Sequence, residues 1–91
     1  MFQIEWDAEK AESNFRKHGV AFTEAASIFG DDLSVTVYDP DRSMDEDRYL
    51  TMGMSVAGRV LIVSHTNRGD AVRIISARLA TRRERKSYEE D

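Results

Sequence analysis

The sequence predicts a single small α+β domain, in which an antiparallel sheet packs with two N-terminal helices and one C-terminal helix. Apolar residues recur at helical spacing early in the chain, alternating or β-branched runs fill its second half, and glycine or proline marks most boundaries. With 91 residues, 41% of them hydrophobic and 33% charged, the chain has room for one core. We therefore expect one domain over residues 1–91 with the element order β-α-α-β-β-β-β-α.

The first third of the chain predicts a strand followed by a pair of helices. Residues 2–6 alternate between apolar and polar side chains, as a half-buried strand does. Asp7 is a good N-cap for a helix over about residues 8–18, and Gly19 is a good C-cap. A second helix is expected to begin at a Thr23 cap and to end at the next glycine.

The remainder predicts four strands and a final helix. The strands are expected at residues 33–38, 48–55, 59–66 and 71–78. Residues 39–47 form an acidic loop, and Asn67-Arg68-Gly69-Asp70 is a strong hairpin signal. The last three strands should therefore form an antiparallel meander. Residues 80–89 are good helix formers and predict the closing helix.

The face on which each hairpin side chain lies depends on the turn. A turn centred on residues 68–69 would place Ser76 and Arg78 on one face and Arg73 on the other. Arg73 stands between apolar neighbours, where a guanidinium is costly to bury unless it meets a carboxylate or a phosphate. We expect Arg73 and Arg78 to project into one phosphate-sized hollow.

Charge is distributed unevenly along the chain, although its net value is −4. Eight basic residues between Arg59 and Lys86 face only Asp70 and Glu84 in sequence, whereas residues 31–47 contain seven acidic residues and one arginine. This asymmetry predicts two surfaces with different partners.

Composition also limits the compartment and the chemistry. The chain has no cysteine, so disulfides and thiolate metal sites are excluded. Its N-terminus does not resemble an export signal, and no apolar run has the length of about 20 residues that a membrane helix needs. We expect a cytoplasmic protein that does not contact a membrane.

Four motifs along nearly the whole chain follow the pattern of a known family. They are Glu5-Trp6-Asp7 with Lys10, Phe15-Arg16-Lys17-His18-Gly19-Val20 with Phe22 and Glu24, Asp45-Glu46-Asp47-Arg48-Tyr49, and the segment from Arg59 through Glu84. On these motifs the sequence resembles the BrnT toxins, a branch of the RelE-like ribonuclease toxins. Asn67 departs from the family pattern, in which an acidic residue is usual at that position.

The resemblance implies a compact toxin with a RelE-like fold that cleaves RNA without a metal ion or cofactor. It also implies a cognate BrnA-like antitoxin that holds the toxin inactive. In such pairs the antitoxin usually carries the DNA-binding part and the complex represses its own operon, so DNA is a partner only through the antitoxin.

Metal-free RNA cleavage needs a base for the 2′-hydroxyl proton, an acid for the leaving oxygen and cations on the phosphate. The candidates are Arg73 and Arg78 for the phosphate, Lys17 and Arg68 for the RNA backbone, His18 and His65 for proton transfer, Glu46 as a reserve base, and Ser76 as a hydrogen-bond donor. Further RNA contacts are expected from Arg59, Arg82 and Arg83.

Several of these residues have a purely structural alternative. His65 could be a core histidine, and His18 could simply stabilise the C-terminal end of a helix. Glu46 could form an ordinary ion pair with Arg48, and the last helix could present a solvated basic face. The chain as a whole could be a non-catalytic RNA- or protein-binding module, or a subunit that matures only in a complex.

Overall fold

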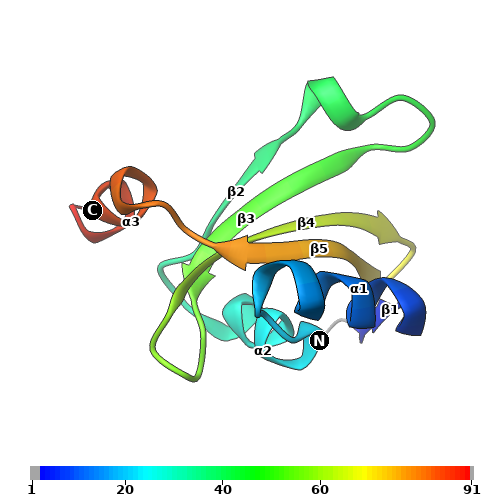
Figure 1. Cartoon of the computed structure of the whole chain (residues 1–91). Coiled ribbons are helices and arrows are strands. Elements are labelled where there is room, and N and C mark those ends of the chain that lie inside the picture. Colours follow the sequence, from blue (N-terminus) through cyan, green and yellow to red (C-terminus); the bar gives the residue numbers. More distant parts are fainter. Residues whose placement is uncertain (1–2, 91) are drawn as a thin grey trace.

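The structure is a computed structural model that describes residues 3–90. In this range one five-stranded sheet, with strand order β1-β5-β4-β3-β2, packs with three α-helices (Figure 1). The elements are β1 (Gln3–Trp6), α1 (Ala8–His18), α2 (Phe22–Ser27), the 3-10 turn η1 (Ile28–Gly30), β2 (Val35–Tyr38), the 3-10 turn η2 (Pro40–Arg42), β3 (Arg48–Met54), β4 (Val60–Arg68), β5 (Ala71–Leu79) and α3 (Arg82–Glu89). The expected element order is confirmed.

The sheet is mixed, so the expectation of a purely antiparallel sheet is wrong for its first strand. Strands β3 to β5 form the expected antiparallel meander and β2 extends it, but β1 lies parallel to β5, with Gln3 opposite Ala71 and Trp6 opposite Ile74. No hairpin joins these two strands. The connection between them runs through α1, α2 and three strands, which is long enough for β1 to pair with β5 in the parallel direction.

The helix ends follow local capping chemistry with one exception. The side chain of Asp7 accepts a hydrogen bond from the backbone N–H of Lys10 at 3.0 Å, and Gly19 ends α1 with a φ of 70°. The exception is α2, which begins after Ala21 without a side-chain cap, so the expected Thr23 cap is wrong. Thr81 begins α3 in a capping box with Glu84.

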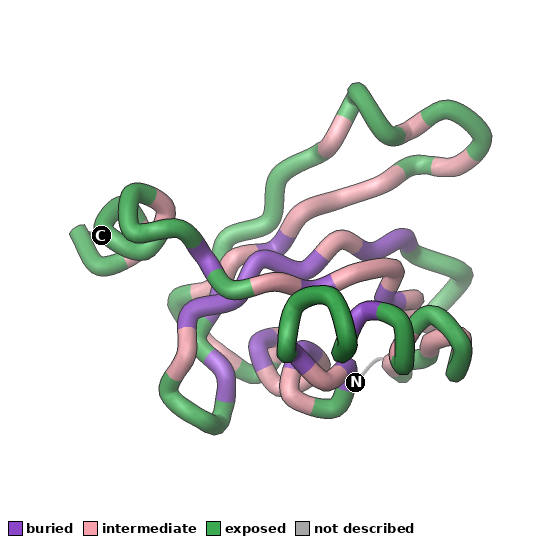
Figure 2. Tube along the Cα trace, viewed as in Figure 1, coloured by how far each residue is buried: buried purple, intermediate pink, exposed green. Residues whose placement is uncertain are grey.

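The helices α1 and α2 and the turn η1 cover one face of the sheet, where the main core lies (Figures 1 and 2). Its buried residues are Val20, Phe22, Ala25, Ile28, Leu61, Val63, Ile74 and Ala77. Trp6 packs edge-on against Phe22, with ring centroids 6.0 Å apart. On the opposite face, which we call the open face, Tyr88 of α3 packs against a small cluster around Val60 and Ile62.

A β-bulge in β5 decides which side chains reach the open face. Ser64 lies opposite Ser76 whereas His65 lies opposite Ile74, so Ile75 is the extra residue. The hairpin turn consists of Gly69 and Asp70, one residue later than expected, and Gly69 has a φ of 59°.

The bulge reverses the alternation of side chains along β5. Arg73, Ser76 and Arg78 therefore all lie on the open face, opposite Thr66, Ser64 and Ile62 of β4. The expectation that Arg73 faces away from Ser76 and Arg78 is wrong for this reason.

Within residues 3–90 no helix has the length and apolar character needed to cross a bilayer.

Candidate functional site

Strand β1 covers one part of the edge of β5, and the side chain of Asn14 covers another part. Strand β1 pairs only with residues 71–74, and beyond the bulge the amide of Asn14 takes the place of a neighbouring strand. Its Oδ1 accepts a hydrogen bond from the N–H of Ala77 at 3.0 Å, and its Nδ2 donates to the carbonyl of Ala77 at 2.9 Å and to that of Val20 at 3.1 Å. These bonds fix α1 at the sheet edge, so His18, one helical turn later, lies beside the open face.

Two hollows of about 200 Å³ each lie next to the end of α1 and share His18 and Ser76 as lining residues. We call them together the His18 cleft. Its ionisable lining residues are Lys10, Lys17, His18, Asp39, Arg42 and Arg78. The structure thus brings together four of the expected site residues, namely Lys17, His18, Ser76 and Arg78. The four lysines and arginines and the three serines of the lining suit the cleft to an anionic ligand.

Arg78 is held in position by Glu84 of α3. Its Nη1 lies 2.8 Å from Oε1 and its Nη2 lies 3.0 Å from Oε2 of the carboxylate. The hydrogen bonds from Arg78 lower the pKa of Glu84 to about 2, and the same pair raises the pKa of Arg78. Because a guanidinium has five N–H groups, Arg78 keeps donors for a second acceptor while Glu84 holds it.

A second charged group, which we call the Arg73 cluster, lies on the open face at the other end of β5. It consists of Glu5, Glu46, Arg48, Arg68 and Arg73. Glu46 pairs with Arg48 at 3.5 Å and with Arg68 at 3.7 Å, and Arg73 pairs with Glu5 at 3.7 Å. The ion pair expected between Glu46 and Arg48 is therefore present.

Arg73 and Arg78 share a face but not a hollow. Arg78 follows Arg73 by five positions in β5, which is a distance of about 15 Å along a strand. Only Arg78 lines the His18 cleft. The expectation of one hollow for both arginines is wrong because the bulge and the strand length place them two side-chain rows apart.

His65 belongs to the core, which contradicts its expected role as a proton carrier to RNA. The residue is 4% exposed, and its Nε2 lies 2.7 Å from the hydroxyl of Thr51. Phe29 packs edge-on against the ring and Tyr49 stacks on it. Burial lowers the pKa of His65. His65 is therefore a core histidine, the structural alternative named above, and its hydrogen-bonding partner is the hydroxyl of Thr51.

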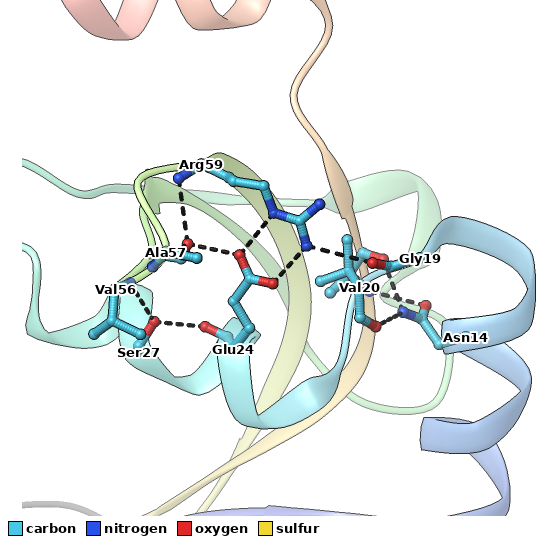
Figure 3. A network of polar contacts seen from close by, with 10 residues as sticks. Asn14, Gly19, Val20, Glu24, Ser27, Val56, Ala57 and Arg59 are labelled. Carbon is cyan, nitrogen blue, oxygen red and sulfur yellow. Dashed lines mark hydrogen bonds and ion pairs between the residues drawn. The ribbon is translucent and has the colours of Figure 1, made fainter.

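Arg59 occupies a structural ion pair, as Figure 3 shows. Its Nε lies 2.9 Å from Oε2 of Glu24 and its Nη2 lies 2.5 Å from Oε1, while Nη2 also donates to the carbonyl of Gly19 at 3.3 Å. The pair joins the β3-β4 turn to the start of α2. This geometry does not favour the expected RNA contact of Arg59.

Arg82 and Arg83 are exposed on α3. This exposure is compatible with a solvated helix face and also with a face that binds RNA.

Six polar lining residues of the cleft were not predicted as site residues from the sequence, namely Lys10, Ser13, Asn14, Asp39, Arg42 and Ser64. Lys10 precedes Lys17 by seven residues, a spacing that places both on one side of a helix, so this pattern could have found it. Asp39 and Arg42 come from the β2-β3 loop, whose position over the cleft follows from no local signal. Within residues 3–90, no three His, Asp or Glu side chains gather as ligands for a metal ion.

Comparisons with known proteins agree on one family. The family model described as ribonuclease toxin, BrnT, of type II toxin-antitoxin system matches residues 6–84. A similar solved structure is that of the ribonuclease toxin BrnT from Brucella abortus, which is 24% identical and superimposes with a TM-score of 0.66. The alignment covers 90% of this chain and 100% of the Brucella chain, and at this identity it shows a shared fold. No curated protein sequence matches the chain.

Proposed function

The chain belongs to the BrnT family of ribonuclease toxins of type II toxin-antitoxin systems, and from this premise we propose that it is a metal-independent endoribonuclease whose active site is the His18 cleft. One observation carries the proposal. His18 of α1 and Ser76 of β5 line both hollows of the cleft, and Lys17 lines one of them and Arg78 the other, although about 60 residues separate the two segments.

In the proposed reaction, the 2′-hydroxyl of the substrate attacks the adjacent phosphorus and the bond to the 5′-oxygen breaks. His18 takes the proton of the 2′-hydroxyl and returns a proton to the leaving 5′-oxygen. The products are a 2′,3′-cyclic phosphate end and a 5′-hydroxyl end. Because one histidine serves both proton transfers, slow cleavage is expected.

The remaining groups of the cleft act on the phosphate. Arg78 stabilises the negative charge that develops on its oxygens, because a guanidinium that Glu84 already holds needs little reorganisation. Ser76 donates a hydrogen bond and Lys17 attracts the RNA backbone. Glu46 lies in the Arg73 cluster and takes no part in this step.

The test uses purified toxin without antitoxin, 5′-labelled RNA and EDTA. We expect cleavage with 2′,3′-cyclic phosphate ends, and a loss of about 100-fold or more in His18→Ala and Arg78→Ala. Arg16→Ala is the matched control, since Arg16 lies on the exposed side of α1 in an ion pair with Glu12. RNA that is retarded on a gel but stays intact would support a non-catalytic binding module instead.

We also propose the partners that the family implies. A BrnA-like antitoxin neutralises the toxin in the cytoplasm and supplies the DNA contacts with which the complex represses its operon, and the fold is a RelE-like one. Induced expression of the chain should arrest growth, and co-expression of the neighbouring small gene should restore it. Normal growth with abundant folded protein would contradict this proposal.

A further inference from the structure

The Arg73 cluster contains guanidinium groups that are packed against carboxylates but not hydrogen-bonded to them. In the sheet register Arg48, Thr66, Arg73 and Glu5 form one row across four strands of the open face. The ion-pair distances in the cluster are 3.5 to 3.7 Å, whereas the bidentate pairs of Arg59 and Arg78 lie at 2.5 to 3.0 Å.

The cluster has both spare donors and spare charge. Within residues 3–90 the guanidinium groups of Arg48, Arg68 and Arg73 make ion pairs without a hydrogen bond, and the Nε of Arg48 is buried and has no acceptor. The ion pairs of the cluster join three guanidinium groups to two carboxylates, so its own carboxylates do not balance all three cations. The side chains of Arg48, Arg68 and Arg73 are 30%, 56% and 29% exposed, so their guanidinium groups can donate hydrogen bonds to a ligand with several anionic oxygens.

The space between the cluster and the His18 cleft suits a polynucleotide backbone. The row between them is formed by Leu50, Ser64 and Ser76, and the two serines also line the cleft. Their short side chains leave the sheet surface low along the line from Arg73 to Arg78. An extended single strand covers the distance of about 15 Å between these arginines in a few nucleotides.

From this geometry we propose that the Arg73 cluster is a second phosphate-binding subsite, which holds the RNA a few nucleotides away from the phosphate that is cut. The inference rests on the proposed function of the His18 cleft. It specifies the substrate class as single-stranded RNA that lies extended across the open face, in contact with both sites at once. Arg73 is then a substrate-binding residue and acts on affinity rather than on the bond that breaks.

The first experiment separates the two sites by substrate length. On an octaribonucleotide, Arg73→Gln should raise KM about tenfold and leave kcat unchanged, because it removes one phosphate contact remote from the reaction. On a dinucleotide, which is too short to reach the cluster, the same variant should behave like the wild type. Equal losses on both substrates, or a loss confined to kcat, would overturn the subsite.

The second experiment needs no cleavage. It measures the affinity of a fluorescein-labelled 2′-O-methyl octaribonucleotide, which cannot be cut, as a function of salt. Arg73→Gln should make the slope of log K against log salt shallower by about 0.7, the value of one phosphate contact on a single strand. Glu5→Gln should raise the affinity, since it removes the carboxylate that competes for Arg73.

Controls keep the two proposals distinguishable. Arg16→Gln removes a cation in an exposed pair away from the open face and should leave the slope unchanged. If Arg73→Gln unfolds, Arg68→Gln at the exposed turn is the second variant and should give the same change of slope. A normal slope in both variants would overturn the subsite. If the slope changes but no RNA is cut, the subsite stands and the proposed function fails.

Discussion

The imidazole of His65 and the hydroxyl of Thr51 lie 2.7 Å apart between strands β4 and β3, and the same hydroxyl lies 2.7 Å from that of Thr36. Both His65 and Thr51 are buried, and aromatic rings flank the imidazole. The chain of polar groups crosses three strands of the sheet. It ties β2, which has an exposed surface on both faces, to the core.

The buried imidazole predicts a loss of stability in mild acid. Burial lowers the pKa of His65, so the unfolded chain binds a proton more readily than the folded one. The free energy of unfolding should therefore be constant above the unfolded pKa of 6.5 and decrease as the pH falls below it. Urea unfolding at intervals between pH 5 and pH 8 measures this slope.

Two substitutions show whether His65 is the group responsible. His65→Gln keeps a hydrogen-bonding atom near Thr51 but cannot titrate, so the slope between pH 5 and pH 6.5 should become shallower. Ser13→Ala, on the exposed surface of α1, removes no titratable group and should leave the slope as it is. An identical slope in the wild type and in His65→Gln would contradict the prediction.

The sequence predicted the element order well because its signals are local. Asp7 and Gly19 bound α1 through caps that span only a few residues, and the hairpin around Gly69 needs a residue that tolerates positive φ. These features depend on the neighbouring residues of the chain and on little else.

The site was harder to predict because two non-local features form it. The bulge at Ile75 turns Ser76 and Arg78 toward the open face, and nothing in an apolar run marks that one residue as unpaired. The β2-β3 loop then carries Asp39 and Arg42 over the cleft. Sequence reasoning therefore selected suitable residue types but grouped Arg73 and Arg78 in one hollow, which the structure divides into two sites.

The side-chain amide of Asn14 takes the place of a strand at the edge of β5, so an isosteric substitution of this residue should strongly lower the stability of the fold. Asn14→Asp removes the donors to the carbonyls of Val20 and Ala77 and places a buried carboxylate opposite them. We expect a loss of about 3 kcal/mol in the free energy of unfolding, measured in urea at pH 7. Gln3→Glu, the same change of amide to carboxylate at an exposed position of β1, is the matched control and should change stability by less than about 0.5 kcal/mol.

Because Arg59 is paired with Glu24, its loss should lower the stability of the fold without lowering the affinity for RNA. Arg59→Ala should lower the thermal midpoint, because Glu24 loses the partner whose hydrogen bonds lower its pKa. The affinity for the 2′-O-methyl octaribonucleotide should stay within about twofold of the wild type, since the pair lies outside both proposed RNA sites. A loss of affinity at temperatures where the variant is fully folded would restore the role in RNA binding that the sequence predicts for Arg59.

The bidentate contact of Glu84 with Arg78 predicts that α3 positions a residue of the proposed active site. Glu84→Ala removes that contact and half of the capping box, whereas Thr81→Ala removes only the helix cap at a cost of about 1 kcal/mol. If the carboxylate orients Arg78 for the phosphate, cleavage should fall about tenfold in Glu84→Ala and remain near the wild-type rate in Thr81→Ala. An equal loss of activity in these two variants would show that helix stability, and not the orientation of Arg78, sets the rate.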